Sequence, residues 1–432
     1  MKDLSVFQII LLAVFAALAI SGILIFALFV GGGTGNTIGP VTIWGTLDQN
    51  AFTVVLRQVA ENDKRLSQVT YVQKDPATYA DLLTEALASG TGPDIFLLRQ
   101  DYVVRDGGKI LPIPYDYLSQ SQFEDTFVEA AWPYLAENGV LGIPVAVDPM
   151  VLYWNRDMLS SAGFAKSPQY WSELSDVVQK VVKKDDSGTI QKAAVSFGEY
   201  ENVDHAKDIL GLLIQQAGGT ITQRDNTGRL VPTLSARTAG PQQSAEAAVN
   251  FYTSFADPSR AEYSWNRSLA DSHAAFAAGD LALYLGYASE ARTIARTNPN
   301  LNFAVAPMPQ RGGADRALNV ARVYALAVSR ASRKPEAAKT VASLIADTGI
   351  ARSLSLALGF PSARRDVLAE KSADENVLFE SQALIAHSWI DPYPEKTDDI
   401  FRAMIENVTS GAARSTEAIG RANQEMAEII GQ

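Results

Sequence analysis

The sequence of 432 residues contains no cysteine and only three histidines, and each scarcity removes a class of chemistry. Without cysteine there is no disulfide bond, no thiolate zinc site and no cysteine nucleophile. His205, His273 and His387 lie far apart, and none has a second histidine at a spacing typical of metal ligands. The sequence therefore predicts no metal ion and no other cofactor.

Common catalytic motifs are also missing from the sequence. It has no serine elbow, zinc-binding helix motif, Walker loop or dinucleotide glycine fingerprint. The run Gly90-Thr-Gly-Pro93 is too short for a phosphate loop, and it precedes a predicted strand instead of following one. We therefore expect that the protein is not an enzyme. A pair of Asp or Glu residues acting on a glycoside stays open as an alternative.

Positive charge is scarce relative to negative charge. The chain has 37 Lys and Arg residues against 48 Asp and Glu residues, a formal net charge of -11. An acidic protein repels phosphate backbones. The charge balance therefore predicts that nucleic acid is not a partner.

Charge of either sign is absent between Asp3 and Asp48, and residues 6–30 form a nearly unbroken apolar run. At 1.5 Å per residue this run spans roughly 37 Å as a helix, enough to cross a bilayer with some tilt. Lys2 precedes the run, and the next basic residue is Arg57, so the positive-inside bias places the N-terminus in the cytoplasm. The following residues are then extracytoplasmic.

A cleaved signal peptide is the alternative interpretation of this run. Cleavage after the small-x-small pattern at Ala17 to Ala19 would leave a bare apolar N-terminus, which disfavours it. We therefore expect residues 1–30 to be a cytoplasmic stub and transmembrane signal anchor, embedded in the cytoplasmic membrane through residues 6–30. The glycine-rich residues 31–40 are then a flexible tether.

After the tether, strand-like and helix-like segments alternate. Residues 41–45, 69–73 and 94–98 are rich in β-forming residues, and residues 49–62 have apolar side chains at helical spacing. A further helix is predicted from an Asp75 cap, with Pro76 at its first position, to Gly90. This order predicts a parallel, doubly wound sheet with right-handed crossovers.

Later segments continue the alternation. Residues 139–147 and 151–154 are predicted to be two separate extended segments, and residues 320–329 another strand. Ligands of open α/β sheets bind beyond the carboxyl ends of the strands. That rule selects the loops at residues 46–49 and 99–102.

Several stretches resemble motifs of a known family, and they are Val41 to Gly45, Leu87 to Phe96, Leu141 to Asp157, Ser167 to Leu174, Ala274 to Leu283, Val305 to Pro309 and Arg333 to Leu344. The second resembles a "small-Gly-x-Gly-Pro-Asp-apolar" signature, and the third a "Gly-Ile-Pro … Leu-Tyr-Tyr-Asn-Lys-Asp" block. In this order, over residues 41 to about 420, they resemble the family 1 extracellular solute-binding proteins, the group that contains maltose-binding protein.

The resemblance implies an α/β, two-lobe periplasmic-binding-protein fold of type II, maltose-binding-protein-like, preceded by the membrane helix. The chain would cross between lobes near residues 147–149, 307–311 and 360–361. Lobe 1 would then comprise residues 41–147 and 310–360, and lobe 2 residues 148–309 and 361–432.

The same resemblance implies a function. A monomeric, membrane-anchored protein would bind a small solute, a sugar or an oligosaccharide, and deliver it by lobe closure to the permease subunits of an ABC importer. A ligand sensor that signals through its membrane helix is the alternative, because an uncleaved anchor also fits that role.

The resemblance places acidic ligand-binding positions at Asp48, Asp101 and Asp148, each with a plainer alternative. Asp48 could instead cap the helix that begins at residue 49. Asp101 could be a solvated loop charge. Asp148 could form a hinge turn with Pro149.

Sugar rings stack on aromatic side chains, so aromatic residues complete the predicted site. The resemblance selects Tyr287, Trp389 and Tyr393, with core packing as the alternative for each. Arg99 and Tyr102 join the site because they bound the loop that the strand-end rule selects after the third strand. Leu98 or Arg99 stands where the family has an aromatic residue, which departs from the maltose-binding pattern.

The anchor prediction can be tested by topology. Protease applied to intact spheroplasts should release a soluble fragment that lacks residues 1–30, because Lys2 holds the short N-terminus inside. Mass spectrometry of the fragment identifies its start. Full protection of the chain from external protease would contradict the predicted orientation.

Overall fold

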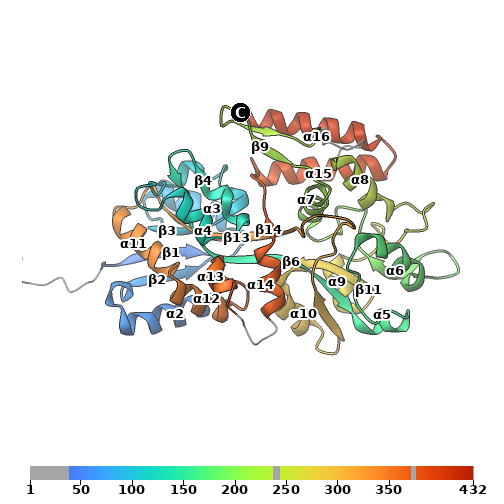
Figure 1. Ribbon diagram of the computed structural model, residues 1–432, viewed down its shortest axis with the longest axis horizontal. Helices are drawn as coiled ribbons and strands as arrows, with labels where there is room; N and C mark the ends of the chain where they lie inside the picture. Colours follow the sequence, from blue (N-terminus) through green and yellow to red (C-terminus); the bar gives the residue numbers. More distant parts are fainter. Residues whose placement is uncertain (1–37, 237–243, 371–375, 432) are drawn as a thin grey trace, which may run out of the picture.

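The computed structural model describes residues 38–236, 244–370 and 376–431. The predicted anchor, and the tether up to residue 37, lie outside these residues. One sheet of ten strands runs through the molecule, in the order β2-β1-β3-β13-β6-β11-β8-β7, with β12 paired to β6 and β14 to β13 (Figure 1). Its strands are β1 Val41–Gly45, β2 Val69–Gln73, β3 Ile95–Arg99, β6 Ile143–Asn155, β7 Lys183–Lys184, β8 Ile190–Val195, β11 Leu281–Tyr287, β12 Phe303–Ala306, β13 Asn319–Val328 and β14 Ala386–His387.

Helices cover both ends of this sheet. They are α2 Gln49–Asn62, α3 Tyr79–Ser89, α4 Gln120–Thr126, α5 Arg156–Ser161, α6 Leu174–Val181, α7 Ala206–Gln216, α8 Ser244–Ser254, α9 Ser272–Ala278, α10 Ala291–Thr297, α11 Pro335–Ile345, α12 Thr348–Leu358, α13 Arg365–Leu368, α14 Asn376–Leu384, α15 Pro394–Thr409 and α16 Ser415–Ile430. Within the described ranges, no single helix is long and apolar enough to cross a membrane. Only α11 and α12 together reach that length and composition, with a 70° bend between them.

The predicted alternation at the start of the domain is confirmed. β1 pairs in parallel with β2 and β3, and the connecting helices α2 and α3 follow the predicted periodicity. Gly90 ends α3 in the left-handed conformation at φ 72°. The predicted start at Pro76 is wrong, because the Asp75 carboxylate accepts the N–H of Ala77 in a turn and α3 begins three residues later.

Residues 143–155 form one strand, β6, and not the two extended segments that we predicted. Its first half pairs antiparallel with β13, and its second half pairs with β11 and β12. Pro149 has no N–H to donate, but its partner across the ladder is Ala321 and the strand continues through it. The distant strand β13 thus holds β6 extended where the local sequence favours a turn.

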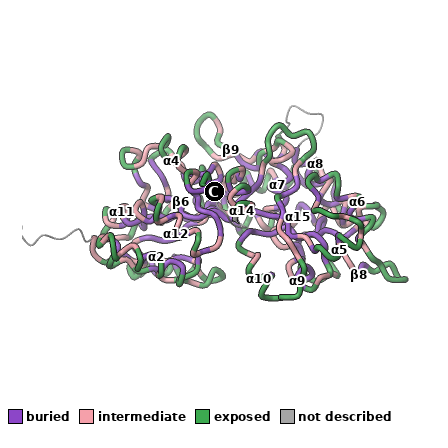
Figure 2. Tube along the Cα trace, turned by 60° about the horizontal axis from the view of Figure 1, so that its bottom comes forward, coloured by how far each residue is buried: buried purple, intermediate pink, exposed green. Residues whose placement is uncertain are grey.

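Buried apolar residues form two separate cores, which define two lobes. The lobe 1 core draws on residues 41–147, 321–368, Ala383 and Ala386. The lobe 2 core draws on residues 150–308, Val320 and residues 400–426. Figure 1 shows lobe 1 at the left and lobe 2 at the right, and in Figure 2 buried chain around β6 connects them.

The chain first passes between the cores inside β6, between Val147 and Met150. The predicted last crossing at residues 360–361 lies elsewhere, because the chain after Pro361 stays against lobe 1. The Val147 N–H donates to Pro361 O at 2.9 Å, and the Val128 N–H donates to Ala363 O at 3.1 Å. The last crossing follows Ala386, the last residue of the lobe 1 core.

Near the centre of lobe 1, one buried hydroxyl joins two strands of the sheet. The Tyr134 hydroxyl lies 2.7 Å from Leu98 O of β3 and 2.8 Å from Val323 O of β13. Tyr134 is fully buried. Removing its hydroxyl would leave two carbonyl groups without this donor in a dry environment.

We expect Tyr134→Phe to lower the free energy of unfolding by about 1–3 kcal/mol, the cost of leaving buried polar groups unsatisfied. Denaturant unfolding of the full-length protein measures the change. Tyr117→Phe is the matched control, because the Tyr117 ring is 46% exposed. Equal effects of the two substitutions would contradict a special role for the buried hydroxyl.

Candidate functional site

Three adjoining cavities lie between the lobes, and we call them together the interlobe cleft. The first, of about 310 Å³, lies on the lobe 1 side and shares Arg99, Tyr102 and Arg322 with the second. It is lined by Thr46, Leu47, Pro76, Tyr79, Ala80, Leu83, Phe96, Leu97, Leu98, Arg99, Tyr102, Arg105, Asp106, Arg322 and Tyr324. The second, of about 590 Å³, is lined from both lobes, and the third is a recess of about 30 Å³. Arg322 of β13 lines all three.

The carboxyl ends of β1 and β3 open onto the first cavity, as the rule for open α/β sheets predicts. Thr46 and Leu47 follow β1, and Arg99 ends β3. The 3-10 helix Gln100–Tyr102 then turns the chain across the cleft edge. Both loops that the sequence selected therefore reach the same cavity.

Arg99 and Asp101 form a bidentate ion pair at this edge. Arg99 Nε donates to Asp101 Oδ1 at 2.7 Å, and Nη2 donates to Oδ2. The guanidinium also lies 4.9 Å from the centre of the Tyr102 ring. The pair presents acceptors and donors side by side, which suits the recognition of hydroxyl groups.

Lobe 2 contributes the N-terminus of α7. His205, just before the helix, is the one non-glycine residue with positive φ in the described part of the chain, at φ 60°. His205 Nε2 lies 2.7 Å from Glu290 Oε1, and its Nδ1 lies 3.3 Å from Arg322 Nη2. A guanidinium only donates, so Nδ1 accepts and Nε2 carries the hydrogen that Glu290 accepts. These two contacts fix the ring orientation.

Arg322 is the centre of the charge network in the cleft. Its Nη2 lies 3.1 Å from Asp208 Oδ2, and its guanidinium lies 3.9 Å from the centre of the Tyr287 ring. The Tyr287 hydroxyl donates to the same Asp208 oxygen at 2.7 Å. Burial alone would raise the pKa of Asp208, but the charges of Arg322 and Lys207 and the hydrogen bond from Tyr287 lower it to about 2. Asp208 is therefore ionised at neutral pH.

A second buried pair closes the recess. Lys207 Nζ donates to Asp391 Oδ2 at 2.9 Å and to Pro394 O at 3.0 Å. Burial raises the pKa of Asp391 to about 6, although Lys207 acts against this rise. The Trp389 ring lines the recess and stacks on Phe401 of lobe 2 with a centroid separation of 6.2 Å.

Five of the eight predicted site residues line the interlobe cleft, and they are Arg99, Asp101, Tyr102, Tyr287 and Trp389. Tyr287 is only 2% exposed, and Arg322 covers its ring. It therefore offers little ring surface for the predicted stacking on a sugar.

The other three predicted residues do not line these cavities. The Asp48 carboxylate caps α2 by accepting the Ala51 N–H at 2.8 Å. Asp148 is 2% exposed and accepts the Ser289 N–H at 2.9 Å. Tyr393 is 39% exposed and immediately precedes α15. The contact of Asp48 is therefore the helix cap that the sequence offered as the alternative to ligand binding.

Sequence reasoning missed much of the charged lining, which includes His205, Lys207, Asp208, Arg322, Asp391, Glu395, Asp398 and Arg402. A signal for Arg322 was present, because it is the one charged residue in an otherwise apolar predicted strand at residues 320–329. Lys207 and Asp208 carried no comparable signal, since charged residues are common in the first turn of any helix.

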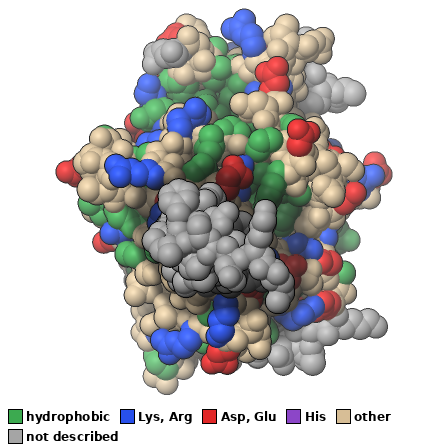
Figure 3. All heavy atoms as spheres, turned by 90° about the vertical axis from the view of Figure 1, so that its left-hand side faces the viewer, with side chains coloured by type: hydrophobic (Ala, Val, Ile, Leu, Met, Phe, Trp, Pro, Cys, Tyr) green, Lys and Arg blue, Asp and Glu red, His purple; other side chains and the backbone are tan. Residues whose placement is uncertain are grey.

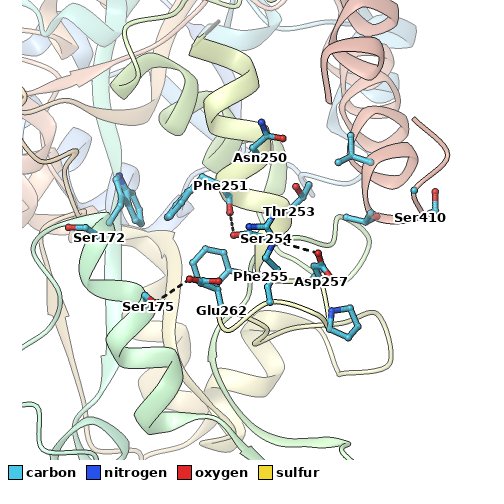
Figure 4. Close-up of a pocket in the computed structure, with 17 residues that line it drawn as sticks. Ser172, Ser175, Asn250, Phe251, Thr253, Ser254, Phe255, Asp257, Glu262 and Ser410 are labelled. Carbon is cyan, nitrogen blue, oxygen red and sulfur yellow. Dashed lines mark hydrogen bonds and ion pairs between the residues drawn. The ribbon is translucent and has the colours of Figure 1, made fainter. Parts of the chain in front are cut away.

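A larger hollow of about 840 Å³ lies elsewhere, on lobe 2 (Figure 4). Residues of α6, of α8 with the loop after it, and of the end of α15 line it, and the Ser175 hydroxyl donates to Glu262 there at 3.3 Å. Every lining residue belongs to lobe 2, and the hollow shares none of them with the cavities that meet at Arg322, so it does not adjoin the space between the lobes. The interlobe cleft is therefore the candidate functional site.

A family model described as bacterial extracellular solute-binding protein matches residues 60–381. The chain belongs to this family. The expected family resemblance is thereby confirmed, and a family of binding proteins agrees with the expectation that the chain is not an enzyme. Curated binding proteins of Brucella abortus and Brucella suis are 24% identical over 100 residues, and this match spans 23% of the chain and only 24% of theirs.

Solved structures confirm the two-lobe fold. The cyclic α-maltosyl-1,6-maltose binding protein of Arthrobacter globiformis has a TM-score of 0.74 at 16% identity, covering 91% of this chain and 99% of that one. A cyclo/maltodextrin-binding protein in complex with maltotetraose has a TM-score of 0.72 at 18% identity, covering 92% of this chain and 98% of that one. An ABC transporter solute-binding protein of Thermotoga lettingae bound to α-D-tagatose has a TM-score of 0.68 at 19% identity, covering 91% of this chain and 100% of that one.

The buried carboxyl of Asp148 predicts a pH-dependent stability. Burial raises its pKa from 3.8 to about 6, so the folded state holds its proton more tightly than the unfolded state. Its charge therefore opposes folding as the pH rises through about 6, and has no effect below the unfolded pKa.

We expect Asp148→Asn to be more stable than the native protein at pH 7.5, by up to about 3 kcal/mol, and equally stable at pH 3.5. The amide oxygen still accepts the Ser289 N–H, and only the charge is lost. Unfolding curves across this pH range measure the difference. Asp208→Asn is a control of opposite sign, because the lowered pKa of Asp208 makes its charge stabilising at neutral pH. A constant difference at all pH values would contradict the assignment.

Proposed function

We propose that this protein is a membrane-anchored, extracytoplasmic solute-binding protein that delivers a sugar or oligosaccharide to an ABC importer by lobe closure. The observation that carries the proposal is that the interlobe cleft is lined from both lobes. Family membership supports the binding role. The ligands bound in two solved structures of the same fold, maltotetraose and α-D-tagatose, support a carbohydrate.

Direct contacts across the cleft support closure as the working motion. Arg105 belongs to lobe 1, and its Nη1 lies 2.5 Å from Glu395 Oε1 of α15, which packs in lobe 2. Arg322 of β13 contacts Asp208 of α7. A ligand that contacts both sides would stabilise the closed arrangement in the same way, and a permease can recognise that shape.

The cleft lining suits a polyhydroxylated ligand. Arg99 and Asp101 pair donors and acceptors that can bind hydroxyl groups. Tyr102, Tyr200 and Trp389 add aromatic rings to the walls. Few polar groups placed among aromatic rings are typical of small-molecule sites, and aromatic faces pack on the apolar face of a sugar.

Residues 1–30 supply the proposed anchor, which would keep a monomeric binding domain beside its permease. Two consequences set transport apart from a sensory role. A transport protein should cross-link to permease subunits, whereas a sensor should depend on its own membrane helix for signalling.

Ligand binding can be tested on the full-length protein in detergent. A bound sugar at a hundred times its dissociation constant should stabilise the protein by about 2.7 kcal/mol. Asp101→Ala should weaken binding about ten- to hundred-fold, because charge-assisted hydrogen bonds to hydroxyl groups are lost. Calorimetry measures affinity, and solution scattering measures the expected decrease in radius of gyration.

Asp63→Ala is the matched control, because Asp63 and Arg65 form the same kind of bidentate pair two residues apart, outside the cleft. It should leave affinity unchanged. Absence of binding across neutral and acidic sugars would overturn the proposed function. Equal loss of affinity in Asp63→Ala and Asp101→Ala would show that the effect is not local to the cleft.

A further inference from the structure

The 310 Å³ cavity carries an excess of positive charge in an otherwise acidic protein. Its lining includes three cationic side chains, Arg99, Arg105 and Arg322, and one acidic side chain, Asp106. Three positive charges less one negative charge give +2, against a net charge of -11 for the whole chain. Elsewhere, Figure 3 shows acidic and basic side chains interspersed on the visible face.

The partners of the two innermost guanidiniums lie outside this cavity. Asp101, the partner of Arg99, lines the other two cavities, and so does Asp208, the partner of Arg322. The two arginines therefore stand between these carboxylates and the first cavity. The positive charge of Arg99 also acts to lower the pKa of the Arg322 guanidinium.

Both guanidiniums have N–H groups that take no part in these ion pairs. Arg99 uses Nε and Nη2 for Asp101, and Arg322 uses Nη2 for Asp208 and His205. Among the described residues, no acceptor is hydrogen-bonded to Arg99 Nη1 or to Nε and Nη1 of Arg322. Unused N–H groups of two neighbouring guanidiniums suit the two oxygens of a carboxylate.

Strand register brings these groups to one place. Tyr324 of β13 stands opposite Arg99 of β3 in the antiparallel ladder, and Arg322 lies two residues before Tyr324. Side chains two residues apart on a strand share a face, so all three face the first cavity. The hydroxyls of Tyr102 and Tyr324 line the same cavity, and neither has a hydrogen-bond partner within the described ranges.

The rest of the cavity wall is apolar or aromatic, with Leu47, Leu83, Phe96 and Tyr79 among its residues. A small inorganic anion would leave this surface uncovered, whereas a sugar ring would pack on it. The volume of about 310 Å³ lies at the lower end of the range typical of small-molecule sites.

From this geometry we propose that the preferred ligand is an acidic saccharide, whose carboxylate binds between Arg99 and Arg322 while its ring fills the 310 Å³ cavity. This assignment rests on the proposed function, and it narrows the ligand from sugars in general to uronic or aldonic acids, free or at the end of an oligosaccharide.

The test compares pairs of ligands that differ in the acidic group, using calorimetry on the full-length protein in detergent. The pairs are glucose with glucuronate, galactose with galacturonate, and α-1,4-linked galactotriose with trigalacturonate. At least one acidic member should bind ten-fold or more tightly than its neutral partner. Its affinity should fall as sodium chloride increases, because the carboxylate pairs with two cations.

Arg99→Gln and Arg322→Gln should each weaken binding of the acidic ligand about ten- to hundred-fold, and so reduce its advantage over its neutral partner. Arg65→Gln is the matched control, because Arg65 pairs with Asp63 as Arg99 pairs with Asp101. It should have no effect. Melting curves identify a variant that fails to fold. In that case the other arginine variant decides the result, together with the affinities of the native protein for the ligand pairs.

The possible failures are distinguishable. Neutral sugars that bind as tightly as acidic ones would overturn the acidic ligand and leave the proposed function standing. Acetate or phosphate binding as tightly as the uronates would overturn the saccharide part. No binding by any member of the panel would overturn both proposals.

Discussion

The antiparallel pairing of β6 with β13 is the interaction on which the rest of this structure depends. β6 continues from the core of one lobe into the core of the other, and its pairing with β13 ends beside the cleft. Breaking that ladder would expose backbone groups in the driest part of the molecule. The ladder therefore keeps the two lobes joined, and the cleft lies next to the shared strands.

The chemistry of the cleft follows from this position. Arg322 stands opposite Asp148 in the β13–β6 register, so a charge is placed at the junction of the lobes. A buried guanidinium needs compensating carboxylates, and Asp208 meets this need from lobe 2. The Arg322–Asp208 ion pair therefore has two effects. It compensates a buried charge, and it forms a contact between the lobes. A ligand entering here meets groups that are already oriented.

The parts of the fold set by local sequence were predictable, and those set by distant contacts were not. β1, α2 and β2 match their predicted ranges, because the apolar spacing of each segment is sufficient to define it. The loop at residues 99–102 was found from the strand order alone. Asp148 and Pro149 favoured a turn in the sequence, but pairing with β13 keeps them extended. The two strands are far apart in the chain, because Met150 and Asn319, which are hydrogen-bonded, are separated by 169 residues. Arg322, Lys207 and Asp208 converge only in the folded protein.

The long separation of β3 from its neighbour β13 has a consequence for how the protein acquires its structure. Gln100 and Ala321, joined by a side-chain contact at the cleft edge, are 221 residues apart in sequence. β3 is buried on both faces, so it cannot remain in water as a stable edge strand until β13 arrives. Lobe 1 thus completes its sheet only after synthesis of the chain has passed β13, and contacts of such long range form slowly. Folding of lobe 1 therefore depends on a strand that follows far along the chain, and β3 has an unpaired apolar edge until that strand is available.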